Sequence, residues 1–238
     1  MKIALVDERI SPECERNLLL RGIKIIKVPR AGGLGEAICS HPDTVMFAHN
    51  GKIISSADYM EEAPFLFSDI CELLPDTSFK FTSESFSERY PLDAIFNALV
   101  IGSKIFYKED TVSPAIKEYA RATGLTPFPV KQGYPACTVL PLGKSAAITA
   151  DRGMAKRLRD AGIRVTEISE GHISLPPHKY GFIGGCAGCD GENVYFLGQI
   201  ESHPDSDIIK AAITAEGLVP VSLSKGMLCD LGRIIFIG

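Results

Sequence analysis

The chain has 238 residues, of which 45% are hydrophobic, so it can bury the core of one large domain and does not have the composition of a disordered protein. A net charge of -4, with no block of Lys and Arg, excludes the electrostatic pattern of a nucleic-acid or anionic-membrane binder. No apolar run reaches the roughly 18 residues that span a bilayer, and seven scattered cysteines do not form a disulfide framework. We therefore expect a cytoplasmic protein whose partner is a small-molecule substrate or another protein.

A repeated pattern of strand, helix and strand runs along the chain. Each unit starts with a short apolar strand, passes through an acidic residue into an amphipathic helix, and ends with a second strand after a Gly or Pro break. The units cover residues 3–28, 52–81, 104–130, 146–168 and 194–223. The acids expected to cap the helices are Asp7, Asp58, Asp110, Asp151 and Asp205.

A further strand precedes each of the last four units and is joined to it by a tight turn. The turns are marked by Asn50-Gly51, Gly102, Gly143 and Asp190-Gly191, which lie between apolar runs as in β-hairpins. The first unit lacks this leading strand, whereas the C-terminal segment LCDLGRIIFIG has no helix after it. We predict that this segment completes the first unit, so that residues 1–238 form a single domain of five ββαβ units closed into a ring.

Three motifs in successive units carry polar or reactive side chains. SHPDTVMF contains His41 and Asp43, which are two residues apart and would therefore share one face of a strand. AIFNALVIG contains Asn97, and QGYPACTVLPLG contains Cys137 four residues after Gly133.

This combination of repeat and motifs resembles the pentein fold, an α/β-propeller with five-fold pseudosymmetry, and the guanidino-group-modifying enzymes that have it. These enzymes are the arginine and agmatine deiminases, dimethylarginine hydrolases and amidinotransferases. Their cysteine lies near the C-terminus, so the resemblance implies a ring opened at another point. It implies Cys137 as the nucleophile, His41 as the acid/base, and Asp43 as the residue that orients His41 or anchors the substrate, without a metal or organic cofactor.

The resemblance also implies side chains that bind a guanidinium. Asp190 and Asp230 are the candidate carboxylates, and Asn97 is a third substrate-binding candidate. The acidic motifs of the family are not reproduced around either aspartate. Gly184 and Gly185 stand where those enzymes have a side chain, and we expect them to let a bulkier or less basic substrate approach closely.

Simpler interpretations of the same residues stay open. Cys137 could be a packed core thiol and Asn97 a satisfied buried amide. Cys186 and Cys189 form a C-x-x-C pair, but no second pair has ligand spacing, so the sequence does not predict a metal site. The hypotheses are a cysteine-dependent hydrolase or deiminase acting on a C–N bond of a guanidino, amidino or related compound, and a non-catalytic pentein-fold scaffold. An ordinary α/β domain is the third alternative, and the sequence leaves open whether a homo-oligomer forms.

Overall fold

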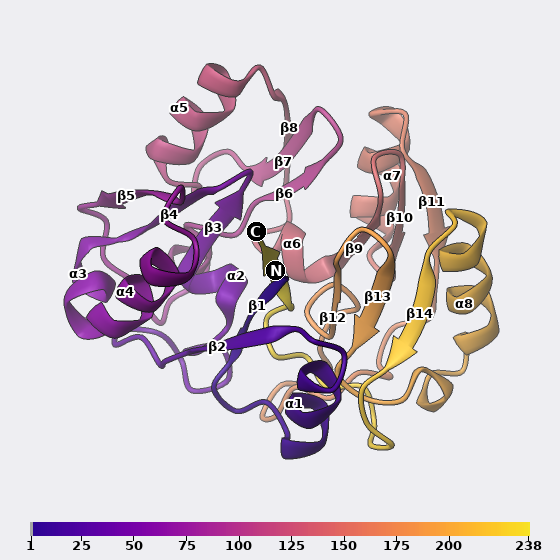
Figure 1. Cartoon of the computed structure of the whole chain (residues 1–238). Helices are drawn as coiled ribbons and strands as arrows, with labels where there is room; N and C mark the ends of the chain where they lie inside the picture. Colours follow the sequence, from indigo (N-terminus) through magenta and orange to yellow (C-terminus); the bar gives the residue numbers. More distant parts are fainter. Residues whose placement is uncertain (1) are drawn as a thin grey trace.

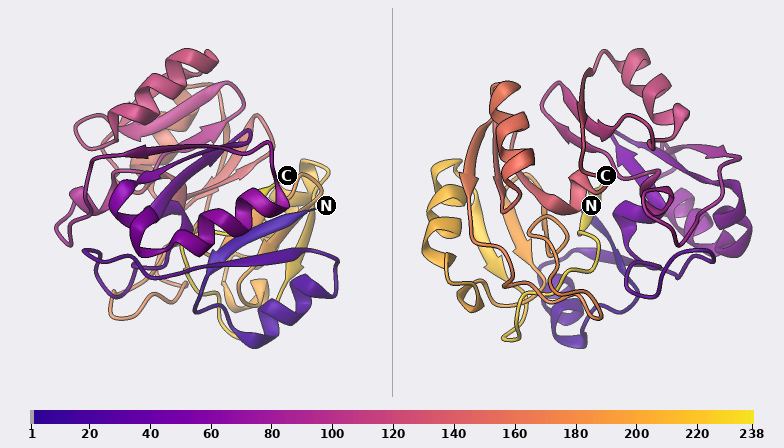
Figure 2. Two further views of the ribbon diagram at one scale, coloured as in Figure 1. Left: turned by 60° about the vertical axis from the view of Figure 1, so that its left-hand side comes forward. Right: turned by 180° about the vertical axis from the view of Figure 1, so that it is seen from behind.

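The protein is a ring of five small sheets. The structure, a computed structural model, describes residues 2–238. Over these residues the chain forms five three-stranded sheets around a common centre, with the long helices on the outside (Figures 1 and 2). In each sheet the middle strand pairs antiparallel with the first strand and parallel with the third. This arrangement confirms the predicted α/β fold of five ββαβ units.

Each sheet is built from strands in the order first, middle and third. These strands are β15 (Ile235–Ile237), β1 (Ile3–Asp7) and β2 (Lys24–Val28); β3 (Met46–His49), β4 (Lys52–Ser56) and β5 (Ser78–Thr82); β6 (Leu99–Ile101), β7 (Lys104–Lys108) and β8 (Thr126–Val130); β9 (Val139–Leu142), β10 (Ala146–Thr149) and β11 (Arg164–Glu167); and β12 (Ala187–Cys189), β13 (Asn193–Phe196) and β14 (Val219–Ser222).

Helices connect each middle strand to the third strand of its sheet. They are α1 (Pro12–Leu19), α3 (Ala57–Glu62) with α4 (Pro64–Leu73), α5 (Pro114–Thr123), α7 (Arg152–Asp160) and α8 (Ser206–Ala215). Single helical turns elsewhere are α2 (Pro42–Val45), η1 (Leu92–Ala94), α6 (Pro135–Thr138) and η2 (Ile200–Ser202). Within residues 2–238, no helix combines the length and the apolar character needed to cross a membrane.

The two ends of the chain meet in one sheet. β15 pairs antiparallel with β1, and Ile237 lies opposite Ile3. β12 lies against both β9 and β15, so the first strands of three consecutive units are neighbours near the centre (Figure 1). The C-terminal segment therefore supplies the first strand of the N-terminal unit.

The hydrophobic core lies between neighbouring units. Successive side chains of a strand point to opposite faces, so each middle strand contributes to two clusters. In β4, Ile53 packs with residues of the preceding unit, whereas Ile54 packs with those of the following unit. In the same way Val194 of β13 joins the fourth and fifth units, and Tyr195 joins the fifth unit to the first. The ring is thus closed by apolar packing as well as by strand pairing.

Serine rather than aspartate caps three of the helices. Ser11, Ser56 and Ser113 each accept a hydrogen bond from a backbone N–H in the first turn of α1, α3 and α5. The predicted caps Asp7, Asp58 and Asp110 are therefore wrong. Asp151 does cap α7, through its bond from the Met154 N–H, and Asp205 precedes α8 without a side-chain cap bond. The prediction took the acid nearest to each helix start as the N-cap. Serine can satisfy the same backbone N–H donors, so an acid was not required.

We predict that Ser113→Ala destabilises the protein more than Asp110→Ala. The Ser113 hydroxyl accepts from the Ala115 N–H at 3.2 Å and donates to Glu84 at 2.7 Å, and loss of such a cap costs about 0.5–2 kcal/mol. The Asp110 side chain is 89% exposed, so its loss should cost little. Urea denaturation of both variants measures the difference, and an equal or larger loss for Asp110→Ala would contradict the assignment.

Candidate active site

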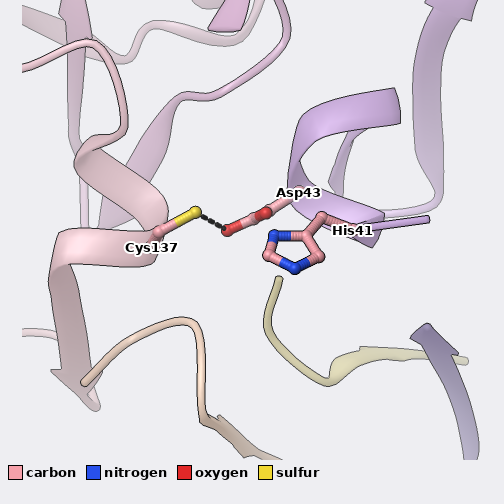
Figure 3. A group of neighbouring side chains, drawn as sticks. All are labelled: His41, Asp43 and Cys137. Atoms are coloured by element: carbon pink, nitrogen blue, oxygen red, sulfur yellow. Dashed lines mark hydrogen bonds between the residues drawn. The ribbon is translucent and has the colours of Figure 1, made fainter. Parts of the chain in front are cut away.

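The candidate residues are presented by short helical turns at the centre of the ring. His41 is the N-cap of α2, Asp43 lies within α2, and Cys137 lies within α6 (Figure 3). Pro42 and Pro135 begin these turns, a position at which proline is favoured. The prediction that His41 and Asp43 share a strand face is wrong, because the strand β3 starts only after the turn. One donor atom from each of His41, Asp43 and Cys137 nevertheless lies within 4.8 Å of the other two.

A hydrogen bond links the thiol directly to a carboxylate. The Cys137 Sγ–H donates to Asp43 Oδ2 at 2.8 Å, and both side chains are almost completely buried (Figure 3). The Asn97 amide holds the two segments together: its Nδ2 donates to Cys137 Sγ at 3.3 Å and to the Asp43 carbonyl at 3.1 Å. Its Oδ1 accepts from the Ala136 N–H at 2.8 Å. Asn97 therefore lies at the site as predicted by position, but its contacts are with protein atoms.

Burial controls the protonation of this pair. Burial raises the pKa of the Cys137 thiol well above its usual value, and the nearby carboxylates of Asp43 and Asp230 raise it further. Burial also raises the pKa of Asp43 to about 7, against the lowering effect of the hydrogen bond from Cys137. At neutral pH the thiol thus keeps its proton, and the carboxyl group that accepts its hydrogen bond is close to its titration midpoint.

His41 lies beside this pair without sharing its hydrogen bonds. The side chain is 1% exposed, and neither ring nitrogen has a hydrogen-bond partner within residues 2–238. Burial lowers the pKa of His41 to about 3, and the positive charge of Arg9 lowers it further. Asp43 therefore does not orient His41 by a hydrogen bond. The nearest carboxylate is that of Asp7, whose Oδ2 lies 4.0 Å from His41 Nε2.

Asp7 is a candidate residue that sequence reasoning assigned to another role. It was expected to cap a helix, but it is 1% exposed at the end of β1 and is held by Arg9. Arg9 donates from Nε to Asp7 Oδ1 at 2.9 Å and from its terminal nitrogen to Oδ2 at 2.6 Å. The sequence signal that could have identified Asp7 is a charged residue at the end of a fully apolar strand. A charge in such a position is buried only when it has a partner.

Asp230 reaches the site from the segment that leads into β15. It is 1% exposed and accepts hydrogen bonds from the Phe182 N–H at 2.8 Å and from the Gly232 N–H at 3.0 Å. Burial raises the pKa of Asp230 to about 6, although these backbone donors lower it. These backbone donors already satisfy part of the hydrogen-bonding capacity of Asp230.

The expectation that Gly184 and Gly185 leave room for a substrate is wrong, because protein atoms fill this space. A Cβ on Gly185 would lie 2.0 Å from Asp230 Oδ1, and one on Gly184 would lie 2.4 Å from the Ala136 carbonyl oxygen. These glycines instead permit close packing around the carboxylate and the α6 turn.

Asp190 is not brought to the site. It begins the hairpin turn between β12 and β13, where its Oδ1 accepts from the backbone N–H groups of Glu192 and Asn193. Its Oδ2 forms an ion pair with Lys2 at 2.8 Å and accepts from the Tyr195 hydroxyl at 3.2 Å. The Asp190 carboxylate is thus held in this turn by its protein partners.

A cavity of about 550 Å³ opens over the site, and we call it the central cavity. His41, Cys137 and Asp230 line it, whereas Asp43 lies behind the thiol. The sequence did not identify Asp93, a buried acid that also lines this cavity. Two larger clefts, of about 970 and 760 Å³, include neither Cys137 nor His41.

The cluster also has the composition of a metal site. A thiol, a carboxylate and an imidazole are ligand types that bind zinc and related ions, and the donor atoms of Cys137, Asp43 and His41 lie close enough to share one. Here the Cys137 proton occupies the space between sulfur and carboxylate.

The ring of ββαβ units with these residues at its centre defines a pentein-fold protein. The structure is similar to a dimethylarginine dimethylaminohydrolase, with a TM-score of 0.58, 10% identity, and coverage of 94% of this chain and 91% of that chain. It is also similar to the amidinotransferase SxtG from Microseira wollei, from a saxitoxin biosynthetic pathway, with a TM-score of 0.55, 13% identity, and coverage of 93% and 88%. For the agmatine deiminase of C. jejuni the corresponding values are 0.53, 7%, 93% and 76%. Identities this low show a common fold alone.

The sequence matches the model of the Family of unknown function (DUF6873) over residues 5–235. The chain therefore belongs to this family. Comparison with curated protein sequences gives no match.

We predict that Gly185→Ala destabilises the protein, because its Cβ would collide with the Asp230 carboxylate. Overpacking of this kind costs about 1–3 kcal/mol. Gly226→Ala is the matched control, since the nearest atom to its Cβ would be the Ser224 hydroxyl at 3.8 Å. Thermal melting of the two variants provides the comparison, and a Gly185→Ala protein as stable as the control would show that this packing is not required.

We predict that the effect of Asp43→Asn on stability depends on pH. The pKa of Asp43 is about 7 in the folded protein, against 3.8 for an ordinary aspartate. The folded state thus binds this proton more tightly, so stability is lost as pH rises through 7. The melting temperature of Asp43→Asn relative to the parent should be higher at pH 8 than at pH 4, by roughly 2–4 °C per kcal/mol. A difference that does not vary with pH would refute the prediction.

Proposed function

We propose that the protein is a cysteine-dependent hydrolase that cleaves a C–N bond in a small guanidino or amidino compound. The observation that carries the proposal is the hydrogen bond from the Cys137 thiol to Asp43, at the floor of a cavity that His41 and Asp230 also line. The similarity in fold to enzymes named for dimethylarginine, agmatine and amidino groups supports this chemical class.

A cationic substrate would activate the thiol. Asp43 and Asp230 both raise the pKa of Cys137 by their negative charge. A guanidinium or amidinium ion bound beside them offsets this charge and stabilises the thiolate. Asp230 would contribute a charge-assisted hydrogen bond to the cation. Activation would thus depend on occupancy, which protects the ligand-free thiol from adventitious reaction.

The proposed reaction has two steps. In the first, Cys137 sulfur bonds to the central carbon of the cation while the thiol proton passes to Asp43, and the departing amine takes up this proton as its C–N bond breaks. The product is a thiouronium group on Cys137. In the second step, neutral His41 accepts a proton from water as the oxygen bonds to the same carbon, and the thiolate leaves and recovers a proton from His41. The product then loses its remaining O–H proton to solvent and departs as a neutral urea-type or amide-type compound. The net reaction is hydrolysis.

We predict that Cys137 is alkylated by 2-chloroacetamidine faster than by 2-chloroacetamide in the native protein. The two reagents differ in charge, so a negatively charged pocket favours the amidine by about tenfold, equivalent to ~1.4 kcal/mol. The exposed Cys71 is the internal reference for intrinsic reactivity. Mass spectrometry of all seven cysteines gives both rates from one sample.

Two variants define the origin of the preference. Asp43→Asn removes a negative charge beside Cys137 and should reduce the preference for the amidine over the amide, whereas Asp110→Asn should not. The enzymatic proposal would be excluded if Cys137 reacts only after unfolding. It would also be excluded if the ratio of amidine to amide rates is no higher at Cys137 than at Cys71. The ring would then be a non-catalytic binding scaffold.

A further inference from the structure

The central cavity has a strongly acidic lining. Four carboxyl groups line it, those of Glu36, Glu88, Asp93 and Asp230. Within residues 2–238, no Lys or Arg side chain lines this cavity, and apart from His41 its basic lining residue is the exposed His178 at the rim. Such a surface attracts a cation and repels a carboxylate.

Two arginines that contact the lining residues Glu36 and Ala37 are already engaged. Arg30 forms an ion pair with Glu36. Arg9 pairs with Asp7 and donates to the backbone carbonyls of Glu36 and Ala37 at 2.8 and 3.0 Å. Neither guanidinium is therefore oriented to receive an acidic group of a ligand without losing a partner.

The contacts within the described fold do not account for the burial of the Asp93 carboxyl group. It lies in η1, is 6% exposed, and its Oδ1 is buried without a hydrogen-bond partner within residues 2–238. A buried carboxylate oxygen without a partner is costly, and buried polar atoms in native proteins almost always have one. Burial raises the pKa of Asp93, and hydrogen bonding with the Tyr134 side chain lowers it in part, so the unpartnered oxygen is Oδ1. A ligand N–H group would supply the partner that the protein does not provide.

Aromatic rings complete the wall on the same side. The rings of Tyr90 and Tyr134 have centroids 5.8 Å apart. Tyr90 packs so closely on Gly133 that a Cβ there would lie 2.5 Å from the ring, yet Tyr90 remains 54% exposed at the mouth. Tyr180 and Phe182 also line the cavity. Aromatic faces next to carboxylates suit a cation with an apolar body.

We propose that Asp93 binds the ligand directly and that the substrate is a guanidino or amidino cation that carries no carboxylate. This inference rests on the proposed function, which it narrows to one class of substrate. Its unassigned site consists of Asp93 with Tyr90 and Tyr134, which line the central cavity. A ligand with a carboxylate at its far end would meet acids and aromatic rings there, with only His178 to offset its charge.

A matched series of ligands tests the inference. Butylguanidine, agmatine and 4-guanidinobutanoate share the guanidinium group and chain but end in a methyl, an ammonium and a carboxylate group. Binding is measured by isothermal titration calorimetry to Cys137→Ser, which prevents turnover. We expect 4-guanidinobutanoate to bind at least about tenfold more weakly than butylguanidine, a difference of ~1.4 kcal/mol. This comparison needs no variant at Asp93.

Asp93→Asn in the same background tests the residue. We expect it to weaken butylguanidine binding about tenfold, whereas Asp110→Asn, at an exposed position, leaves binding unchanged. Thermal melting checks that both proteins are folded. If Asp93→Asn is not folded, the ligand series alone tests the inference. Equal binding of butylguanidine and 4-guanidinobutanoate, or no effect of a folded Asp93→Asn, overturns the inference and leaves the proposed function standing. If no guanidine binds, the inference fails, and the proposed function fails with it only if Cys137 also shows no preference for the amidine reagent.

Discussion

The hydrogen bond between Cys137 and Asp43 joins two groups at the centre of the ring, where burial disfavours the ionised form of each. Both side chains are buried, and Asp230 adds a further carboxyl group to the same region. Burial disfavours the ionised forms of the thiol and of the two acids, whereas the positive charge of Arg233 favours the ionised form of Asp43. An incoming cation changes this balance for all three groups together. The acids that surround the Cys137 thiol thus favour the binding of a cation at the site.

The five-unit ring brings these groups together from distant parts of the chain. Each first strand begins near the centre, so residues that precede these strands face one another. The pairing of β15 with β1 places the Asp230 segment beside the α2 turn. Gly232 shows how close the approach is, because a Cβ there would lie 2.1 Å from His41 Cβ. The glycines near Asp230 therefore serve the packing of the centre rather than access by a ligand.

The sequence predicted the repeating units well because their signals are local. Alternation within strands and turn residues such as Asn50-Gly51, whose φ angles are 46° and 70°, depend on near neighbours in the chain. The motif spacing also selected Cys137, His41 and Asp43, which do lie together. The approach of Asp7 to His41 and the place of Asp93 in the central cavity, by contrast, depend on how distant parts of the chain meet. The ion pair of Asp190 with Lys2, at the other end of the chain, is a further contact that the local pattern does not show.

The arrangement separates two roles in the proposed reaction. Asp43 accepts the thiol hydrogen bond, and His41 is left with both nitrogens available within the described chain. Burial first, and then the positive charge of Arg9, lowers the pKa of His41 and keeps the imidazole neutral, while Arg9 also pairs with Asp7, the nearest carboxylate. A neutral imidazole can accept a proton from water, whereas an imidazolium cannot. When His41 does gain that proton, Asp7 at 4.0 Å is the carboxylate that stabilises it. The Asp7–Arg9 pair would therefore set the basicity of His41 in the second step, independently of the groups that activate the thiol.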